Sequence, residues 1–318
     1  MKKILIAGGL GYLGGRMAKY FIDNGYSVRI TTRKSENNFP ENIPDNTSVM
    51  QLDYCSEEQV NEAMKGIDTL IHLAGPDAHT ISNDPESVIR QHVQLTGSLV
   101  RATQVNSVKR FIYFSTIHVY GKNLQGVVTE ETKPIPVHPF AKAHLEAESI
   151  IKSQSKKVVT AIVRCSNSFG APYFEIQNCW KLVVNDLCRS AFQNGRLTIK
   201  SAGQDYRDFI AVEDVVRAIH HLLELNNERE MHDVYNLGSS NTVRIIDIAK
   251  KIQKELKDSL DYDCPIETNK SLTKNNEVDS FILSIKKIRQ SGFRPDYGDK
   301  EIRSLLDYCK MKYQLDKN

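Results

Sequence analysis

The sequence has few of the features that mark secreted, metal-binding or membrane proteins. The six cysteines are Cys55, Cys165, Cys179, Cys188, Cys264 and Cys309. They form no CxxC pair and no compact framework, which disfavours a zinc site and predicts free thiols in a reducing compartment. The apolar run near the N-terminus is too short for a signal peptide, and no segment approaches the roughly 18 apolar residues of a membrane helix. We therefore expect a cytoplasmic protein with no bound metal and no membrane partner.

Charge is nearly balanced along the chain. There are 42 Lys and Arg residues against 39 Asp and Glu residues, which gives a net charge of +3. No run of five like charges occurs, and no basic stripe is interleaved with aromatic residues. A nucleic-acid surface needs such a patch, so we expect a small-molecule substrate and no nucleic-acid partner. The 318 residues, 40% of them hydrophobic, suffice for one large domain or two interleaved ones.

The first half of the chain alternates short apolar runs with helical patterns. Residues 3–7 form a continuous apolar run, residues 12–25 have helical spacing that stops at Gly25, and residues 26–33 alternate as a strand does. The same rhythm returns with strand patterns at 47–54, 68–75 and 109–116, each followed by a helical stretch. Parallel strands need crossover helices, so this pattern predicts an α/β fold with a Rossmann-type, doubly wound parallel sheet.

After the strand predicted at 156–165, this rhythm breaks. The remainder combines helical patterns at 173–193, 212–225, 243–256 and 300–313 with isolated strand patterns at 196–202 and 233–238. We interpret residues 1–165 as a dinucleotide-binding domain. Residues 166–318 are then mostly a smaller substrate-binding lobe, interleaved with the last elements of the sheet.

A glycine-rich turn directly follows the first predicted strand. Gly8, Gly11 and Gly14 have GxxGxxG spacing between that strand and the first helix. Glycines there permit a tight turn and let a phosphate approach the backbone N–H groups at the helix start. This context predicts a dinucleotide site, whereas the alternative is a glycine turn with no ligand.

The end of the second predicted strand bears on the choice of cofactor. An NAD site usually has an acidic residue there for the ribose 2′-hydroxyl, whereas an arginine accommodates a 2′-phosphate. No acid occurs until Glu36, and Arg33 with Lys34 lies where that phosphate would be. The pattern favours NADP over NAD, although both side chains are alternatively only solvated.

Taken together, motifs along nearly the whole chain resemble one known family. The matching segments are GGLGYLG at 8–14, QLDY at 51–54, DTLIHLAG at 68–75, RFIYFSTIHVYG at 110–121, RCSNSFGAP at 164–172, GQDYRDFIAVEDVVRAI at 203–219, YNLGSS at 235–240 and SGFRP at 291–295. In this order they are similar to the extended short-chain dehydrogenase/reductases, which include nucleotide-sugar epimerases, dehydratases and ketoreductases. The resemblance is specific for the fold and less specific for the reaction.

The resemblance also implies roles for individual residues. Thr116 would hydrogen-bond the reacting oxygen, and Lys142 would hold the nicotinamide ribose. Asn167 and Arg207 would meet the diphosphate of a nucleotide sugar, although Arg207 alternatively forms a structural salt bridge with Glu213 or Asp214. The residues implied to line the cofactor are Gly8, Gly11, Tyr12, Leu13, Gly14, Asp53, Tyr54, Leu73 and Ala74.

Two positions depart from the family pattern. His92 stands where the family has asparagine, with Leu95 in place of a glycine. The catalytic tyrosine, four residues before Lys142, is replaced by His138. The charge of Lys142 disfavours an imidazolium there, so a neutral His138 would accept a proton more easily than donate one. Alternatively His138 only precedes the helix that Pro139 begins, and the proton passes through Thr116 and water or through His118.

We read these features as an NADP-dependent reductase of a nucleotide-activated 4-keto-6-deoxy sugar, in the biosynthesis of a surface polysaccharide such as O-antigen or capsule. Dehydration is disfavoured, because Ile117 and His118 stand where the family's 4,6-dehydratases have an Asp-Glu pair. The alternatives are a nucleotide-sugar 4-epimerase with bound NAD and a non-catalytic dinucleotide sensor. The resemblance also implies a homodimer through the helices at 86–104 and 139–153.

Overall fold

A computed structural model of the chain describes residues 2–75, 84–154, 158–225, 233–269 and 280–313. Its main feature is a seven-stranded sheet in the order β11-β7-β5-β4-β1-β2-β3, in which every pairing is parallel. The strands are β1 (Lys3–Ala7), β2 (Ser27–Thr32), β3 (Thr47–Gln51), β4 (Thr69–His72), β5 (Arg110–Thr116), β7 (Val159–Cys165) and β11 (Asp233–Leu237). The predicted Rossmann-type sheet is confirmed.

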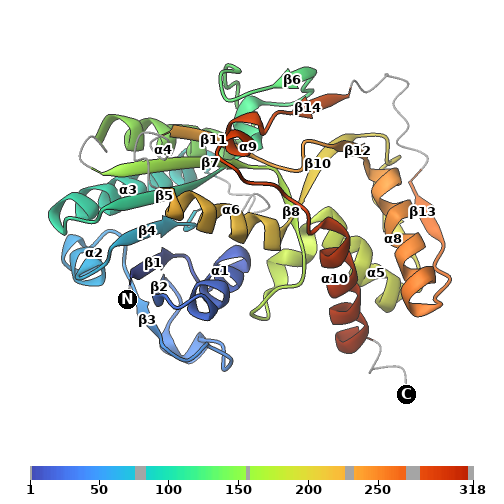
Figure 1. Ribbon diagram of the computed structural model, residues 1–318, viewed down its shortest axis with the longest axis horizontal. Coiled ribbons are helices and arrows are strands. Elements are labelled where there is room, and N and C mark those ends of the chain that lie inside the picture. Colours follow the sequence, from blue (N-terminus) through green and yellow to red (C-terminus); the bar gives the residue numbers. More distant parts are fainter. Residues whose placement is uncertain (1, 76–83, 155–157, 226–232, 270–279, 314–318) are drawn as a thin grey trace.

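Helices cover both faces of this sheet (Figure 1). Helices α1 (Tyr12–Asp23) and α6 (Val212–Glu224) pack on one face, and α2 (Glu57–Met64), α3 (Pro85–Val105) and α4 (Pro139–Gln154) pack on the other. In β1, Ile4 and Ile6 face the first layer while Leu5 faces the second. Such strands are buried on both faces, which explains their continuous apolar runs.

Local sequence signals set where several helices begin and end. Ser56 caps α2 by accepting a hydrogen bond from the N–H of Gln59, and Asp84 caps α3 in the same way from Ser87. Gly25 follows α1 with φ +81°, a left-handed conformation that favours glycine. These signals fix where α2 and α3 begin and where α1 ends.

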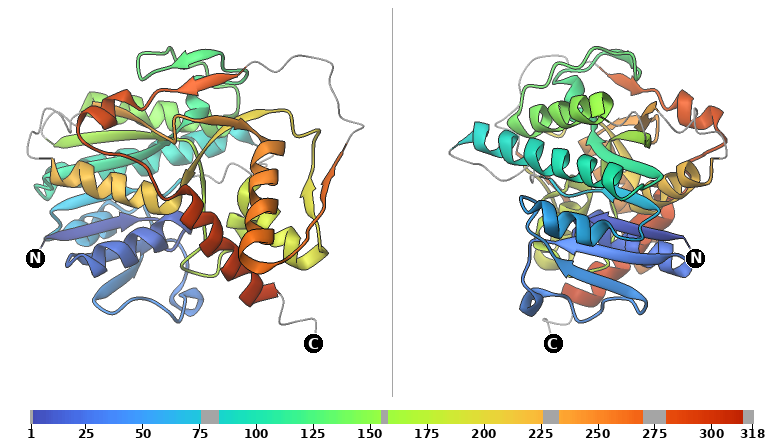
Figure 2. Two further views of the ribbon diagram at one scale, coloured as in Figure 1. Left: turned by 45° about the vertical axis from the view of Figure 1, so that its right-hand side comes forward. Right: turned by 90° about the vertical axis from the view of Figure 1, so that its left-hand side faces the viewer.

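A second core lies beside the sheet (Figure 2). It is built from α5 (Val183–Asn194), α8 (Ile245–Leu260) and α10 (Gly298–Tyr313), with the short pair β9 (Leu197–Ile199) and β13 (Ile266–Thr268). The helix predicted at 173–193 begins only at Val183. The reason is packing: Phe174 is buried against Gly15 of α1, and Trp180 is buried in the 3-10 turn η3 (Gln177–Lys181).

Two small sheets connect these parts. Strand β10 (Tyr206–Ala211) pairs with β8 (Asn167–Phe169) and β12 (Thr242–Arg244), and β6 (Gly126–Val128) pairs with β14 (Phe281–Leu283). The short helix α9 (Lys286–Gln290) precedes α10. All six cysteines are free thiols, as predicted, and five of them are buried. Among the described residues, no helix is long and apolar enough to cross a membrane.

Candidate active site

The glycine turn between β1 and α1 forms a close-packed cradle. A Cβ atom on Gly8, whose φ is +81°, would lie 2.8 Å from the backbone N of Ala74, and one on Gly14 would lie 2.5 Å from Cα of Gly9. Gly11 is the N-cap of α1 and has no side chain to cap the first-turn N–H groups, and no acidic residue occupies that turn. The cradle therefore leaves helix N–H groups available for a phosphate, and these residues fit a dinucleotide.

Two cofactor residues predicted next to the glycines turn their side chains elsewhere. The Tyr12 hydroxyl donates a 2.8 Å hydrogen bond to the carbonyl of Gly170 and lies 3.4 Å from Nδ2 of Asn185, so its ring joins the two cores. Leu13 packs against the core between α1 and the sheet. Any contact of these two residues with a dinucleotide would therefore come from their backbone.

The predicted adenosine end lies where β2 and β3 finish. Arg33 and Lys34 are exposed directly after β2. The buried Tyr54 hydroxyl lies 3.0 Å from Oγ1 of Thr31, and Asp53 is exposed and accepts the N–H of Cys55. The structure thus brings Arg33, Asp53 and Tyr54 to neighbouring strand ends beside the glycine turn. Leu73 and Ala74 lie half-buried after β4, next to Gly8.

The candidate reaction centre lies at the end of β5. Thr116 is 8% exposed, and its Oγ1 accepts the N–H of His118 at 3.3 Å. His118 is exposed on the 3-10 turn η2 (Ile117–Tyr120), and its ring lies 6.4 Å from the ring of Phe140 on α4. Thr116, His118 and the start of α4 are therefore neighbours.

His138 takes part in the start of α4. Its carbonyl accepts the N–H of Lys142 at 3.0 Å, and its Nδ1 accepts the N–H of Phe140 at 3.3 Å. A backbone N–H can only donate, so Nδ1 carries a lone pair and the proton of the neutral ring is on Nε2. Lys142 is exposed, and its ammonium makes no hydrogen bond or ion pair within the described part of the chain. His138 is thus a helix-start residue with one outward donor.

The predicted substrate residues lie on paired strands β8 and β10. Nδ2 of Asn167 donates to the carbonyl of Asp208 at 2.9 Å. Arg207 is 42% exposed, donates to the carbonyl of Tyr206, and its Nη2 lies 3.8 Å from Asp205. The alternative prediction, a salt bridge of Arg207 with Glu213 or Asp214, is wrong. Glu213 pairs with Arg16 instead, and Asp214 pairs with Arg217.

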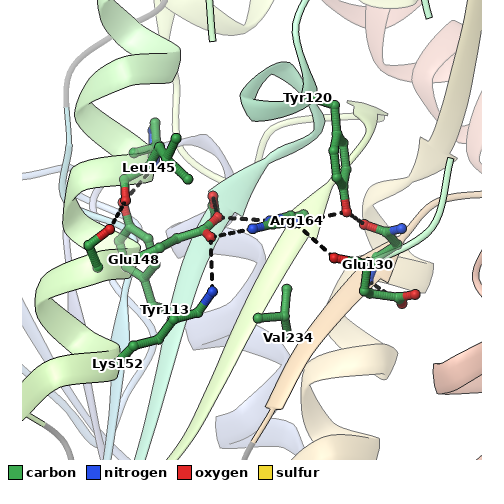
Figure 3. Close-up of polar contacts among 12 residues, drawn as sticks. Tyr113, Tyr120, Glu130, Leu145, Glu148, Lys152, Arg164 and Val234 are labelled. Atoms are coloured by element: carbon green, nitrogen blue, oxygen red, sulfur yellow. Dashed lines mark hydrogen bonds and ion pairs between the residues drawn. The ribbon is translucent and has the colours of Figure 1, made fainter. Parts of the chain in front are cut away.

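A buried ion pair that sequence reasoning missed supports the end of β5 (Figure 3). Glu148 of α4 and Arg164 of β7 are joined at 2.6 Å, and their side chains are 1% and 3% exposed. Ser115 donates to the same carboxylate at 2.6 Å, and the Tyr120 hydroxyl accepts from Arg164 at 3.0 Å. The pair therefore links α4, β5, β7 and η2 around the candidate reaction centre.

A second buried polar cluster was also missed. The Tyr113 hydroxyl lies 2.8 Å from Nε2 of His92 and 2.7 Å from Nδ1 of His144. His72 lies beside them, with its Nε2 3.1 Å from Oγ1 of Thr96. Burial lowers the pKa of His92 to about 4 and holds the pKa values of His72 and His144 well below the usual value. The departure at His92 was the only sequence signal of this cluster.

Comparison with known proteins places these features in context. The sequence model of the NAD dependent epimerase/dehydratase family matches residues 4–238. The low-salt glycan biosynthesis protein Agl12 of Haloferax volcanii is 24% identical over 317 residues, which cover 96% of this chain and 97% of that protein. The human dTDP-D-glucose 4,6-dehydratase is 24% identical and covers 100% of this chain and 92% of that protein.

Solved structures share the fold over nearly all of the chain. The UDP-glucuronic acid 4-epimerase of Bacillus cereus in complex with NAD has a TM-score of 0.81 at 20% identity, with 98% of this chain and 97% of that chain covered. The UDP-glucose 4-epimerase of Thermotoga maritima with UDP-glucose has a TM-score of 0.78 at 22% identity, with 98% and 99% covered. At sequence identities of 20% and 22%, this similarity shows a shared fold and nothing more.

Proposed function

Because the chain belongs to the NAD dependent epimerase/dehydratase family, we propose that it is an NADP-dependent reductase of a nucleotide-activated 4-keto-6-deoxy sugar. Its product would serve the biosynthesis of a surface polysaccharide such as O-antigen or capsule. The observation that carries the choice of a reductase is the end of β2, where Arg33 and Lys34 are exposed and no acidic residue lies between β2 and Glu36. NADPH is the usual donor in biosynthesis, and an arginine there accommodates its 2′-phosphate.

In this proposal the glycine cradle and the adjoining strand ends hold the cofactor. Gly8, Gly11 and Gly14 leave room for the pyrophosphate, and Leu73 with Ala74 lines the nicotinamide side. Arg33, Asp53 and Tyr54 hold the adenosine end, and Lys142 orients the nicotinamide ribose. When bound, the reduced cofactor supplies a hydride to the keto carbon.

The residues at the end of β5 act on the substrate oxygen. Thr116 polarises the carbonyl through its hydroxyl, and Nε2–H of His138 is a second donor on the same side of α4 as Lys142. His138 is a weak source of the proton itself, because releasing Nε2–H while Nδ1 accepts from Phe140 would leave an imidazolate. His138 could give up a proton only if its Nδ1 first lost the hydrogen bond from Phe140 at the start of α4. His118 or another relay is therefore the better route for the proton.

The nucleotide diphosphate would lie over β8 and β10. Asn167 and the half-exposed Arg207 occupy paired strands there. The guanidinium of Arg207 donates one hydrogen bond to the carbonyl of Tyr206 at 2.8 Å, and its ion pair with Asp205 is long, at 3.8 Å. A guanidinium has five N–H donors, so donors remain for a phosphate, which supports Arg207 as the diphosphate ligand.

A 4-epimerase with tightly held NAD is the second candidate. It is supported by the fold neighbours named above, which are UDP-sugar 4-epimerases, one of them solved with NAD. An epimerase must remove a proton and return one on two faces of the same sugar. The exposed, helix-capping His138 in place of a tyrosine makes that harder to explain than a one-way reduction.

Reading the cofactor of the purified protein separates the two candidates. We expect the reductase to leave purification with an empty or exchangeable site and to oxidise NADPH when a nucleotide-linked keto-sugar is added. Tightly retained NAD together with interconversion of C4 epimers would establish the epimerase. Binding of NADP without turnover of any keto-sugar would instead support the third candidate, a non-catalytic dinucleotide sensor.

We further propose that the protein works in the cytoplasm as a homodimer paired through α3 and α4. These two long helices lie side by side on one face of the sheet (Figure 1). Sedimentation of the purified protein tests the assembly, since a monomer at micromolar concentration would contradict it.

A further inference from the structure

Three residues on three elements form a continuous hydrogen-bonded chain beside the candidate reaction centre. His92 belongs to α3, Tyr113 to β5 and His144 to α4. Nε2 of His92, the Tyr113 hydroxyl and Nδ1 of His144 are joined by contacts of 2.8 Å and 2.7 Å. The three side chains are 3%, 1% and 8% exposed, so water does not compete for these bonds.

The His92 end of the chain lies next to Gly75, on the segment that follows β4. Gly75 is exposed directly after Leu73 and Ala74, and a Cβ atom on it would lie 3.4 Å from Nδ1 of His92. That nitrogen is buried and has no hydrogen-bond partner in the described residues. A buried polar atom without a partner is costly, which makes Nδ1 of His92 a place where a ligand or a water is needed.

The His144 end of the chain lies near Phe140 and His118. His144 lies two residues after Lys142, and its ring stands edge-on to Phe140 with 4.6 Å between ring centres. Phe140 in turn contacts His118, and His118 is close enough to His144 to disfavour an added positive charge there. Nε2 of His144 makes no hydrogen bond within the part of the chain described, so this nitrogen can exchange a proton.

The hydrogen bonds allow only linked states of the two histidines. The hydroxyl of Tyr113 has one proton, so it donates to one imidazole and accepts from the other. If it donates to Nδ1 of His144, both neutral rings carry their proton on Nε2. If it donates to Nε2 of His92, both rings carry their proton on Nδ1. A concerted shift between these states removes a proton from Nε2 of His144 and adds one to Nδ1 of His92, with no ion left in the core.

We propose that His92, Tyr113 and His144 form a buried proton relay for the reaction at Thr116. This inference rests on the proposed function, because reduction of a ketone consumes one proton from water in every turnover. Nε2 of His144 releases a proton towards the substrate oxygen, directly or through His118. Each group passes one proton on, and Nδ1 of His92 takes one from water beneath Gly75. After the product leaves, water returns the proton to Nε2 of His144, and Nδ1 of His92 releases its own to water.

The relay gives one explanation for both histidines that depart from the family pattern, His92 and His138. A tyrosine at position 138 would exchange the proton itself, whereas His138 uses Nδ1 to hold α4. A histidine at position 92 can carry a proton between two nitrogens, which the amide of an asparagine cannot do at neutral pH. Tyr113 and His92 act through His144 and are therefore positioning residues rather than groups that touch the substrate.

Removing the central hydroxyl tests the relay. In Tyr113→Phe, we expect steady-state reduction of the keto-sugar by NADPH to slow at least about tenfold, in line with general acid–base contributions. The affinity for NADPH should stay within about twofold, and the solvent deuterium isotope effect should rise as proton delivery becomes limiting. His92→Asn should act in the same direction. Tyr26→Phe is the matched control, because it removes a tyrosine hydroxyl bonded to Glu224 at the opposite edge of the sheet and should leave turnover unchanged.

A second readout uses the cofactor-free protein. Nitrogen-15 NMR of the labelled histidines should find His92 and His144 in the same tautomer, and opposite tautomers would overturn the relay. So would a folded Tyr113→Phe protein that binds NADPH and turns over at the wild-type rate and isotope effect. If Tyr113→Phe does not fold, the same criteria apply to His92→Asn. A wild-type protein with no NADPH-dependent turnover would remove the proposed function, and the relay would fall with it.

Discussion

Arg164 of β7 donates from Nη2 and Nε to the two carboxylate oxygens of Glu148 on α4, at 2.6 Å and 3.0 Å, with both side chains almost fully buried (Figure 3). Ser115 donates to the same carboxylate and immediately precedes Thr116. The contacts of Glu148 with Arg164 and Ser115 therefore set the position of α4 relative to β7 and to the end of β5. Geometry of that kind would keep Thr116, the group proposed to act on the substrate, in register with Lys142, the lysine proposed to hold the cofactor.

We predict that breaking this pair on one side is strongly destabilising. Arg164→Met leaves a buried carboxylate without its partner, and the free energy of unfolding should fall by about 3 to 5 kcal/mol. The double variant Glu148→Leu with Arg164→Met should recover part of that loss. Urea denaturation measures both. Lys257→Ala, which breaks the exposed pairs with Asp261 and Asp263, is the control and should cost less than about 1 kcal/mol. Equal losses in Arg164→Met and Lys257→Ala would contradict this account.

Arg33 should decide between the two dinucleotides. Arg33→Ala removes the charge proposed to meet the 2′-phosphate, so we expect affinity for NADPH to fall about tenfold while affinity for NADH hardly changes. Fluorescence titration of the two reduced cofactors measures this difference. Arg196→Ala, an exposed arginine paired with Glu267 in the other lobe, should alter neither affinity. An equal loss for NADPH and NADH would show that Arg33 does not read the phosphate.

His138 should matter to the stability of α4 through its side-chain acceptor. Its Nδ1 accepts the N–H of Phe140, as N-cap side chains do. We expect His138→Ala to lower the free energy of unfolding by about 1 kcal/mol and His138→Asn, which keeps an acceptor, to lower it by less than half of that. Denaturation of the two variants at equal pH decides the point, and identical stabilities would argue against a capping role.

The buried histidines should make the protein sensitive to acid. The folded-state pKa of His92 is lowered to about 4, so the folded protein binds fewer protons than the unfolded chain below the ordinary histidine pKa of about 6.5. Above about pH 6.5 the ring of His92 is neutral in both states, and titration of His92 does not reduce the free energy of unfolding. As the pH falls from about 6.5 towards about 4, the unfolded chain binds a proton that the folded protein does not, and the free energy of unfolding decreases. Between about pH 7.5 and 5.5, wild type should lose about 1 kcal/mol more stability than His92→Asn. The same loss in both proteins would mean that His92 does not hold a neutral ring.

Much of the fold could be predicted because its signals are local. The apolar run of β1, the glycine turn and the helical spacing of α1 lie within residues 3–23, and their order implies a parallel sheet. Prediction was weaker beyond residue 165, where the helix expected at 173–193 is shortened to begin at Val183. The buried contact of Phe174 with Gly15 outweighs helical periodicity there, and that contact spans most of a domain in sequence.

The candidate site, like the fold, could be predicted only where its signals are local in the sequence. Motif spacing pointed to Thr116, Lys142 and the glycines, which the structure places at the end of β5, in the first turn of α4 and directly after β1. It could not show that Tyr113 lies between His92 and His144, because those residues come from a strand and two helices and meet only through packing. It also could not distinguish a proton carrier from a helix cap at His138, since that depends on which atom receives the N–H of Phe140.

The most direct test of the central claim follows the hydrogen itself. NADPH deuterated at the transferring position of nicotinamide is mixed with the protein and a nucleotide-linked 4-keto-6-deoxy sugar, and the sugar is analysed by mass spectrometry and NMR. We expect one deuterium at C4 of the product, with the loss of one NADPH per sugar. Recovery of unlabelled C4 epimers from a 4-hydroxy nucleotide sugar, with retained NAD and no consumption of NADPH, would contradict it.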